Sequence, residues 1–135
     1  DVVLDTINFD ELVSKADIVF TGEGKFDSQS LHGKVVMGVA NRSQKYKTPV
    51  IVVTGAIGEN IQEAYNKGIT AIFSINKEPM EFSKSALKSK ENMILTMENI
   101  LRLLSTAVMK YYQHWLHWKN MEIMRCITSV SMAES

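Results

Sequence analysis

Short runs of consecutive apolar residues alternate along the chain with longer stretches whose apolar residues recur every three or four positions. Such runs are typical of strands that are buried on both faces, and the longer stretches are typical of amphipathic helices. The runs lie at Val2–Leu4, Asp17–Thr21, Val50–Thr54 and Ile69–Ile75. Because strands and helices alternate at this spacing, the pattern predicts βαβ units and an α/β fold with a parallel sheet.

Helices are expected between these strands. One covers Asn8–Ser14, and its first residues have the spacing of a capping box. A second carries apolar positions from Leu31 onward and ends near Tyr46. A third begins at Asn60 and ends at Gly68, because glycine readily adopts the left-handed conformation that terminates a helix. In a parallel sheet the ligand lies outside the carboxyl ends of the strands, so the loops that follow the strands are the candidate site.

The last third of the chain has a different pattern. From about Ser83 the apolar residues follow one another at spacings of three and four, which predicts a long helix with a narrow apolar stripe. The stripe consists of Leu87, Ile94, Met97, Leu101, Leu104 and Val108. Both tryptophans and the only cysteine lie beyond it. We therefore divide the chain into a partial domain, residues 1–107, and a tail, residues 108–135, that is helical or poorly ordered.

Composition limits the class of protein. The chain has 135 residues, which is enough for one domain. Its 15 basic and 15 acidic side chains give no net charge, which argues against a nucleic-acid partner. A single cysteine excludes a disulfide framework within one chain. No apolar run is long enough to span a bilayer and no signal peptide is visible, so we expect a cytoplasmic protein without a membrane partner.

The densest group of reactive side chains follows the second predicted strand. It runs from Thr21 to Ser30 and continues through Lys34. Its glycines allow a close approach to a ligand, and its carboxylates and lysines suit a metal–phosphate group or a hydroxyl that loses its proton. The structural alternative is that Asp27 or Ser28 only caps the next helix and the glycines only form turns. Neither a Walker A loop nor a dinucleotide-binding fingerprint is complete here.

Other candidate sites carry weaker signals. Gly55–Gly58 is either a second backbone cradle or a plain turn. His32 is expected to be structural or solvated. His114 and His117 have a spacing that suits a metal, but no acidic third ligand accompanies them, so we predict no metal site. Cys126 lacks any motif and reads as an ordinary thiol.

Three blocks of sequence resemble the bacterial glycerate kinase family. The first is Ala16–Ser30 with His32-Gly33-Lys34 and Gly38-Val39-Ala40, and the others are Pro49–Gly55 and Ala64–Ile75. The resemblance covers roughly residues 1–107 and rests above all on the threonine-glycine-glutamate-glycine block. Lys25 stands where the family often has arginine, and it keeps the charge but loses the bidentate fork. Ser30 stands where the family often has threonine.

The resemblance implies a Rossmann-like parallel sheet with flanking helices, here a partial domain that ends in a long C-terminal helix. It also implies phosphorylation of D-glycerate to phosphoglycerate, with ATP and Mg²⁺ as cofactors. On this reading Asp27 is the catalytic carboxylate that orients or deprotonates the glycerate hydroxyl. The residues that bind substrate or phosphate are Gly22, Glu23, Gly24, Lys25, Gln29 and Lys34.

The resemblance is to the C-terminal portion of these kinases alone. The isolated chain is therefore expected to be inactive without the remaining part. The alternative is a non-catalytic module of the same fold that binds an anion or dimerises. A homo-oligomer would form through an exposed sheet edge or through the C-terminal helix.

Overall fold

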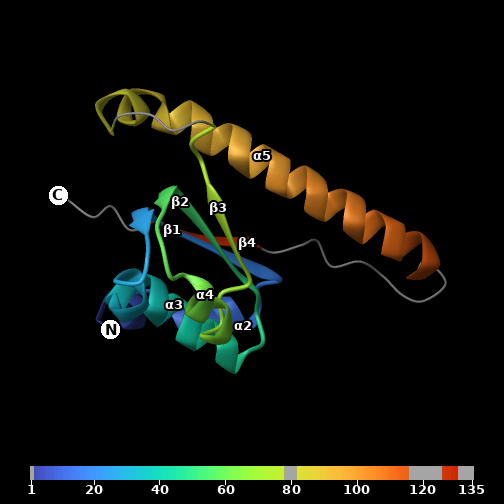
Figure 1. Cartoon of the computed structure of the whole chain (residues 1–135). Coiled ribbons are helices and arrows are strands. Elements are labelled where there is room, and N and C mark those ends of the chain that lie inside the picture. Colours follow the sequence, from blue (N-terminus) through green and yellow to red (C-terminus); the bar gives the residue numbers. More distant parts are fainter. Residues whose placement is uncertain (1, 78–81, 116–125, 131–135) are drawn as a thin grey trace.

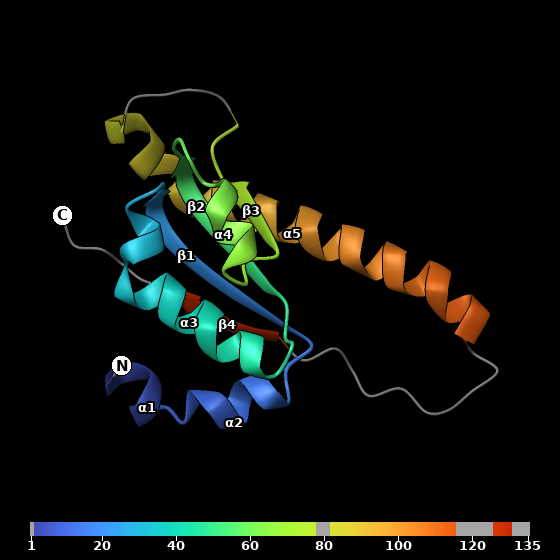
Figure 2. The same cartoon turned by 60° about the horizontal axis from the view of Figure 1, so that its bottom comes forward.

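The computed structural model describes residues 2–77, 82–115 and 126–130, and it has an α/β fold (Figure 1). A parallel sheet lies between two layers of helices, as the sequence pattern predicted (Figures 1 and 2). The strands are β1 (Ile18–Phe26), β2 (Val50–Ile57), β3 (Ala71–Ser74) and β4 (Cys126–Val130). The helices are α1 (Val2–Thr6), α2 (Phe9–Ser14), α3 (Lys34–Lys45), α4 (Gln62–Asn66) and α5 (Phe82–Trp115), with a 3-10 turn, η1, at Ser30–His32.

The described strands are ordered β3-β2-β1-β4, and every neighbouring pair is parallel. Val19 of β1 lies opposite Val50 of β2, and Val53 of β2 lies opposite Phe73 of β3. Because the strands are parallel, the carboxyl ends of β1, β2 and β3 meet at one edge of the sheet. The loops after these strands are therefore neighbours.

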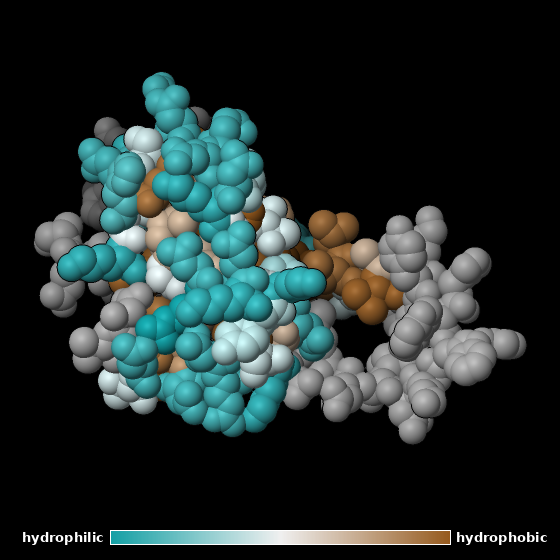
Figure 3. All heavy atoms as spheres, turned by 90° about the horizontal axis from the view of Figure 1, so that it is seen from below, coloured by the Kyte–Doolittle hydropathy of each residue, from teal (hydrophilic) through white to brown (hydrophobic). Residues whose placement is uncertain are grey.

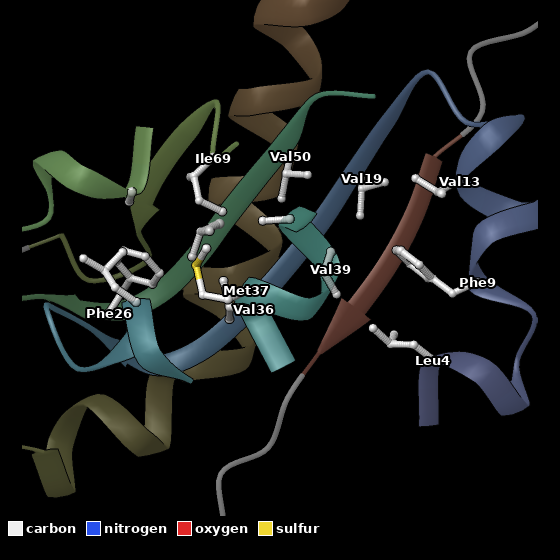
Figure 4. Close-up of a cluster of buried hydrophobic side chains, with 14 residues drawn as sticks. Leu4, Phe9, Val13, Val19, Phe26, Val36, Met37, Val39, Val50 and Ile69 are labelled. Carbon is white, nitrogen blue, oxygen red and sulfur yellow. The ribbon is translucent and has the colours of Figure 1, made fainter. Parts of the chain in front are cut away.

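The face of the sheet that α2, α3 and α4 cover holds the larger apolar core. Phe9 and Val13 of α2 pack there with Val19 of β1 and Val39 of α3, and all four side chains are fully buried (Figure 4). Burying one such side chain contributes roughly 1.5–3 kcal/mol. This cluster fixes α3 across β1 and β2 and so sets where α3 begins.

The opposite face is covered by the middle of α5. Met97 and Leu104 of α5 pack against a cluster that includes Phe20 and Val53 of the sheet. Only part of the predicted apolar stripe packs on the sheet, because the side chains of Leu87 and Val108 are 88% and 50% exposed. Figure 3 shows apolar atoms on the part of α5 that extends beyond the body. Within the described residues, no helix is long and apolar enough to cross a membrane.

The structure corrects the predicted strand at Val2–Leu4, which is the helix α1. Leu4 inserts into the core beside α2, and Asp5 forms an ion pair with Arg42 of α3. The helical conformation allows both contacts. A short apolar segment is not stabilised as a strand when no neighbouring strand pairs with it. The predicted start of α3 near Leu31 is also wrong, since Ser30–His32 forms η1 and α3 begins at Lys34.

A strand in the tail was not predicted. Cys126–Val130 forms β4, which pairs with β1 from Ile18 opposite Cys126 to Gly22 opposite Val130. Consequently β1 is an inner strand, and the edges of the described sheet are β3 and β4. The first residues of the tail continue α5 as far as Trp115.

Candidate functional site

The candidate site is built where β1 and β2 end. Both strands run further than the apolar pattern indicated, β1 through Gly24 to Phe26 and β2 through Gly55 to Ile57. Glu23 lies opposite Thr54, and Phe26 lies opposite Ile57. The polar residues of the motif therefore begin inside paired strands, and pairing fixes their backbone.

Glycine is required within these strands by the close approach of their backbones. A Cβ atom on Gly22 would lie 2.5 Å from the carbonyl oxygen of Val53, and one on Gly55 would lie 2.6 Å from that of Gly24. By contrast, a Cβ on Gly24 would meet nothing within 4 Å. Close strand pairing thus explains why position 22, which is buried, holds a glycine. Gly24 is exposed, and the space beside its backbone is open.

Asp27 follows directly after β1, and both of its carboxylate oxygens are occupied. The Nζ atom of Lys25 lies 3.1 Å from Oδ2, and the backbone N–H of Gln29 donates to Oδ1 at 2.9 Å. The hydrogen bond from Lys25 and then that from Gln29 lower the pKa of the Asp27 carboxyl. Asp27 is therefore a well-stabilised anion and a weak proton acceptor.

Ser30 closes the loop behind Asp27. Its Oγ accepts the backbone N–H of Asp27 at 3.1 Å, and its hydroxyl donates to the carbonyl of Lys25 at 3.3 Å. The helix that follows begins at Lys34, with Gly33 at its N-cap position. Helix capping by Asp27 or Ser28, the structural alternative for this loop, is therefore wrong.

Glu23 has a different environment from Asp27. Its side chain is half-buried, and its buried Oε1 has no hydrogen-bond partner among the described residues. Burial raises the pKa of the Glu23 carboxyl, and the negative charge of Asp27 adds to this increase. The nearby Ser30 hydroxyl acts on this pKa in the opposite direction. The two carboxyl groups of the loop thus have pKa values shifted in opposite directions.

The structure brings four of the predicted residues together, namely Glu23, Lys25, Asp27 and, through its backbone, Gln29. Lys34 is exposed and lies at the first position of α3, beyond η1. The side chain of Lys25 is 64% exposed, so its ammonium group is accessible to an anion.

The loop after β2 supports the charged loop. A Cβ on Gly58 would lie 2.5 Å from the Cβ of Asp27 and 3.4 Å from the Cε of Lys25. The backbone N–H of Gly58 also donates to the carbonyl of Phe26 at 2.8 Å. The glycines at Gly55 and Gly58 therefore allow the two strand ends to pack together.

Asn76 follows β3 and begins one of the loops that the strand pattern marked as candidate site, although the sequence did not single out this residue. Its Nδ2 donates to the carbonyl of Gly55 at 2.6 Å, while its buried Oδ1 has no partner among the described residues. Ser74 donates to the same carbonyl at 3.3 Å. The available signal was a polar side chain directly after a strand of a parallel sheet.

Metal-binding predictions are only partly covered by the structure. Within residues 2–77 and the described part of α5, no three His, Cys, Asp or Glu side chains converge as metal ligands would. The side chains of His114 and Cys126, and the whole of His117, lie outside the described residues. His32 is exposed in η1.

Comparison with known proteins supports the resemblance seen in the sequence. The model of the glycerate kinase family matches residues 1–105. A glycerate kinase of Bacillus cereus is 36% identical over 112 residues, which are 83% of this chain and 29% of the relative. A glycerate 2-kinase of Escherichia coli is 41% identical over 75 residues, which are 56% of this chain and 20% of the relative.

A solved structure agrees with these matches. The crystal structure of a candidate glycerate kinase 2 from Salmonella typhimurium LT2 has a TM-score of 0.57 at 32% identity, and it covers 78% of this chain and 26% of that chain. The chain thus spans less than a third of the length of these relatives. By the family match over most of its residues, the chain belongs to the glycerate kinase family.

Proposed function

We propose that this chain provides the region from Gly22 to Lys34 for the ATP-dependent phosphorylation of D-glycerate. The observation that carries the proposal is the cluster of Glu23, Lys25 and Asp27 at the joined carboxyl ends of β1 and β2. Parallel sheets bind ligands at this edge, and phosphoryl transfer needs charged groups held in fixed positions. The Escherichia coli relative is named a glycerate 2-kinase, which favours the 2-hydroxyl as the phosphate acceptor.

Each predicted binding residue has a place in this proposal. Lys25 and Lys34 neutralise the carboxylate of glycerate or the transferred phosphoryl group. The open backbone at Gly24 and the exposed side chain of Gln29 offer hydrogen bonds to the substrate. Gly22 keeps β1 close to β2, so that these groups stay in place. Asp27 orients the loop by holding Lys25.

Mg²⁺ enters this proposal with ATP, bound to the phosphates of the nucleotide. Magnesium ions dehydrate reluctantly, so in such sites they usually keep several waters and are held largely through substrate phosphates. Within the described part of the chain, no three His, Cys, Asp or Glu side chains converge as metal ligands would. We also propose that the reaction takes place in the cytoplasm.

The test is an amide NMR spectrum of the chain, titrated first with D-glycerate and then with Mg–ATP. Saturable shifts confined to residues 22–34 and 55–60 are expected. A dispersed spectrum that responds to neither ligand would contradict the proposal. Turnover by this chain alone is expected to be negligible, because it spans less than a third of the relatives' length.

One observation favours a second function, dimerisation through α5. Leu87, Ile94, Leu101 and Val108 are 38–88% exposed and recur at intervals of seven residues. Apolar residues at this interval are typical of helices that pair with each other. Sedimentation of the chain and of Leu101→Lys is the measurement. A wild-type dimer that the substitution dissociates is expected, and a wild-type monomer would contradict this function.

A further inference from the structure

The two carboxylates of the loop differ in how their negative charge is compensated. Asp27 has an ammonium group at 3.1 Å from one oxygen and a backbone N–H at 2.9 Å from the other. No ion pair with a described residue compensates Glu23, and its buried Oε1 has no hydrogen-bond partner among those residues. A carboxylate already held by two donors has little affinity for a further proton, whereas an uncompensated one has more.

We propose that Glu23, rather than Asp27, is the carboxylate that accepts the hydroxyl of D-glycerate. This inference rests on the proposed function. Glu23 is catalytic in the sense that it touches the reacting hydroxyl, and Asp27 is a positioning residue that holds Lys25 and the loop. The substrate carboxylate lies toward Lys25, which is exposed beside Asp27.

The position of Glu23 supports this assignment. It lies opposite Thr54 within the paired part of β1, so its backbone is held more firmly than that of the loop. Ser30 lies near Glu23 and accepts the backbone N–H of Asp27, so its hydroxyl links the loop backbone to the neighbourhood of Glu23. Burial makes the ionised form of Glu23 less favourable, and a hydroxyl donor would relieve part of that cost.

The chemical step balances with ATP as the phosphoryl donor. The 2-hydroxyl oxygen of D-glycerate forms a bond to the γ-phosphorus, and the bond from that phosphorus to the bridging oxygen of ADP breaks. ADP leaves with the electron pair. The hydroxyl proton passes to the Glu23 carboxylate and from there to water.

The experiment follows the carboxyl carbons of Glu23 and Asp27 by NMR during titration of the whole chain with D-glycerate or with propionate. Propionate carries the carboxylate but has no hydroxyl group. Both ligands are expected to shift amides near Lys25, whereas only D-glycerate is expected to shift the Glu23 carboxyl carbon. The Asp27 carboxyl carbon should respond little to the presence of the hydroxyl.

The variant Glu23→Gln keeps the size of the side chain and removes its charge. It is expected to bind D-glycerate about 10-fold more weakly and propionate within about 2-fold of wild type, because only the charge-assisted hydrogen bond to the hydroxyl is lost. Glu11→Gln is the matched control, since exposed Glu11 lies on α2 before the amino end of β1. It should change neither affinity.

The outcomes separate this inference from the proposed function. A hydroxyl-dependent response at Asp27 in place of Glu23 would overturn the inference and leave the proposed function standing. Equal responses of Glu23 to D-glycerate and propionate would do the same. Absence of any response to D-glycerate, at the amides and at both carboxyl groups, would reject the proposed function and the inference with it.

Discussion

The loops after β1 and β2 lie side by side and share one backbone device, yet they carry different side chains. In each strand a glycine allows the neighbouring carbonyl oxygen to approach, Gly22 in β1 and Gly55 in β2. In the five residues beyond that glycine, the first stretch carries Glu23, Lys25 and Asp27, whereas the second carries Glu59 as its one charged residue. The comparison teaches that glycine here indicates strand packing, and that the candidate chemistry is indicated by the stretch in which two carboxylates and a lysine lie together.

The largest expected effect tests the shared device. Gly55→Ala should lower the free energy of unfolding by about 3 kcal/mol, because the new Cβ would force β1 and β2 apart. Gly24→Ala should change it by less than about 0.5 kcal/mol, since its Cβ meets nothing within 4 Å. Urea unfolding measures both. Equal losses in the two variants would break the comparison.

The second effect concerns anion binding by the charged loop. Lys25→Gln should weaken the binding of D-glycerate and of propionate by about 10-fold, equivalent to about 1.4 kcal/mol, because both ligands carry a carboxylate. Lys45→Gln, at the exposed end of α3, is the control and should bind both ligands as wild type does. Titration followed by NMR measures these affinities. Unchanged binding by Lys25→Gln would place the anion elsewhere.

The third effect is on stability. Burial raises the pKa of Glu23, so the ionised carboxyl costs stability in the folded state. Glu23→Gln should therefore raise Tm by about 1–3 °C at pH 7. The gain should disappear as the pH falls below the ordinary value of 4.5, where the carboxyl is protonated in both states. A lower Tm for Glu23→Gln at pH 7 would contradict this account of the site.

The smallest effect has the opposite sign. Hydrogen bonds from Lys25 and Gln29 lower the pKa of Asp27, so its ionised form contributes stability above the ordinary value of 3.8 and loses it as the pH falls through the folded-state pKa. Asp27→Asn should lower Tm slightly at pH 7, and the difference should vanish in acid. Solvent screens this pair because the Lys25 side chain is 64% exposed, so the change should be smaller than that for Glu23→Gln.

Much of the fold could be predicted from local pattern. The apolar run at Val50–Thr54 forms the first part of β2, and the run at Ile69–Ile75 contains β3. Gly68 ends the helical segment before β3 with a φ of 95°. The prediction of a strand at Val2–Leu4 was wrong, because Leu4 packs into the core beside α2 and Asp5 pairs with Arg42 of distant α3. The strand β4 carried no usable signal, since its pairing with β1 joins residues more than 100 positions apart.

The composition of the site was also available in the sequence, but the roles within it were not. Glu23 and Asp27 are two carboxylates of the same loop, and their spacing gives no reason to distinguish them. Lys25 and the backbone of Gln29 satisfy Asp27, whereas strand pairing buries Glu23 without a cation. Asn76 reaches the carbonyl of Gly55 only because β3 lies beside β2.

The sequence by itself determined which residues prefer strand or helix, the parallel α/β architecture and the motif that marks the glycerate kinase family. These properties depend on apolar spacing and residue type, which are local. The tertiary structure decided why Gly22 must be glycine, that Gly58 supports Asp27, and that the pKa values of Glu23 and Asp27 shift in opposite directions. Those properties depend on burial and on contacts between separate strands, which exist only after the strands have paired.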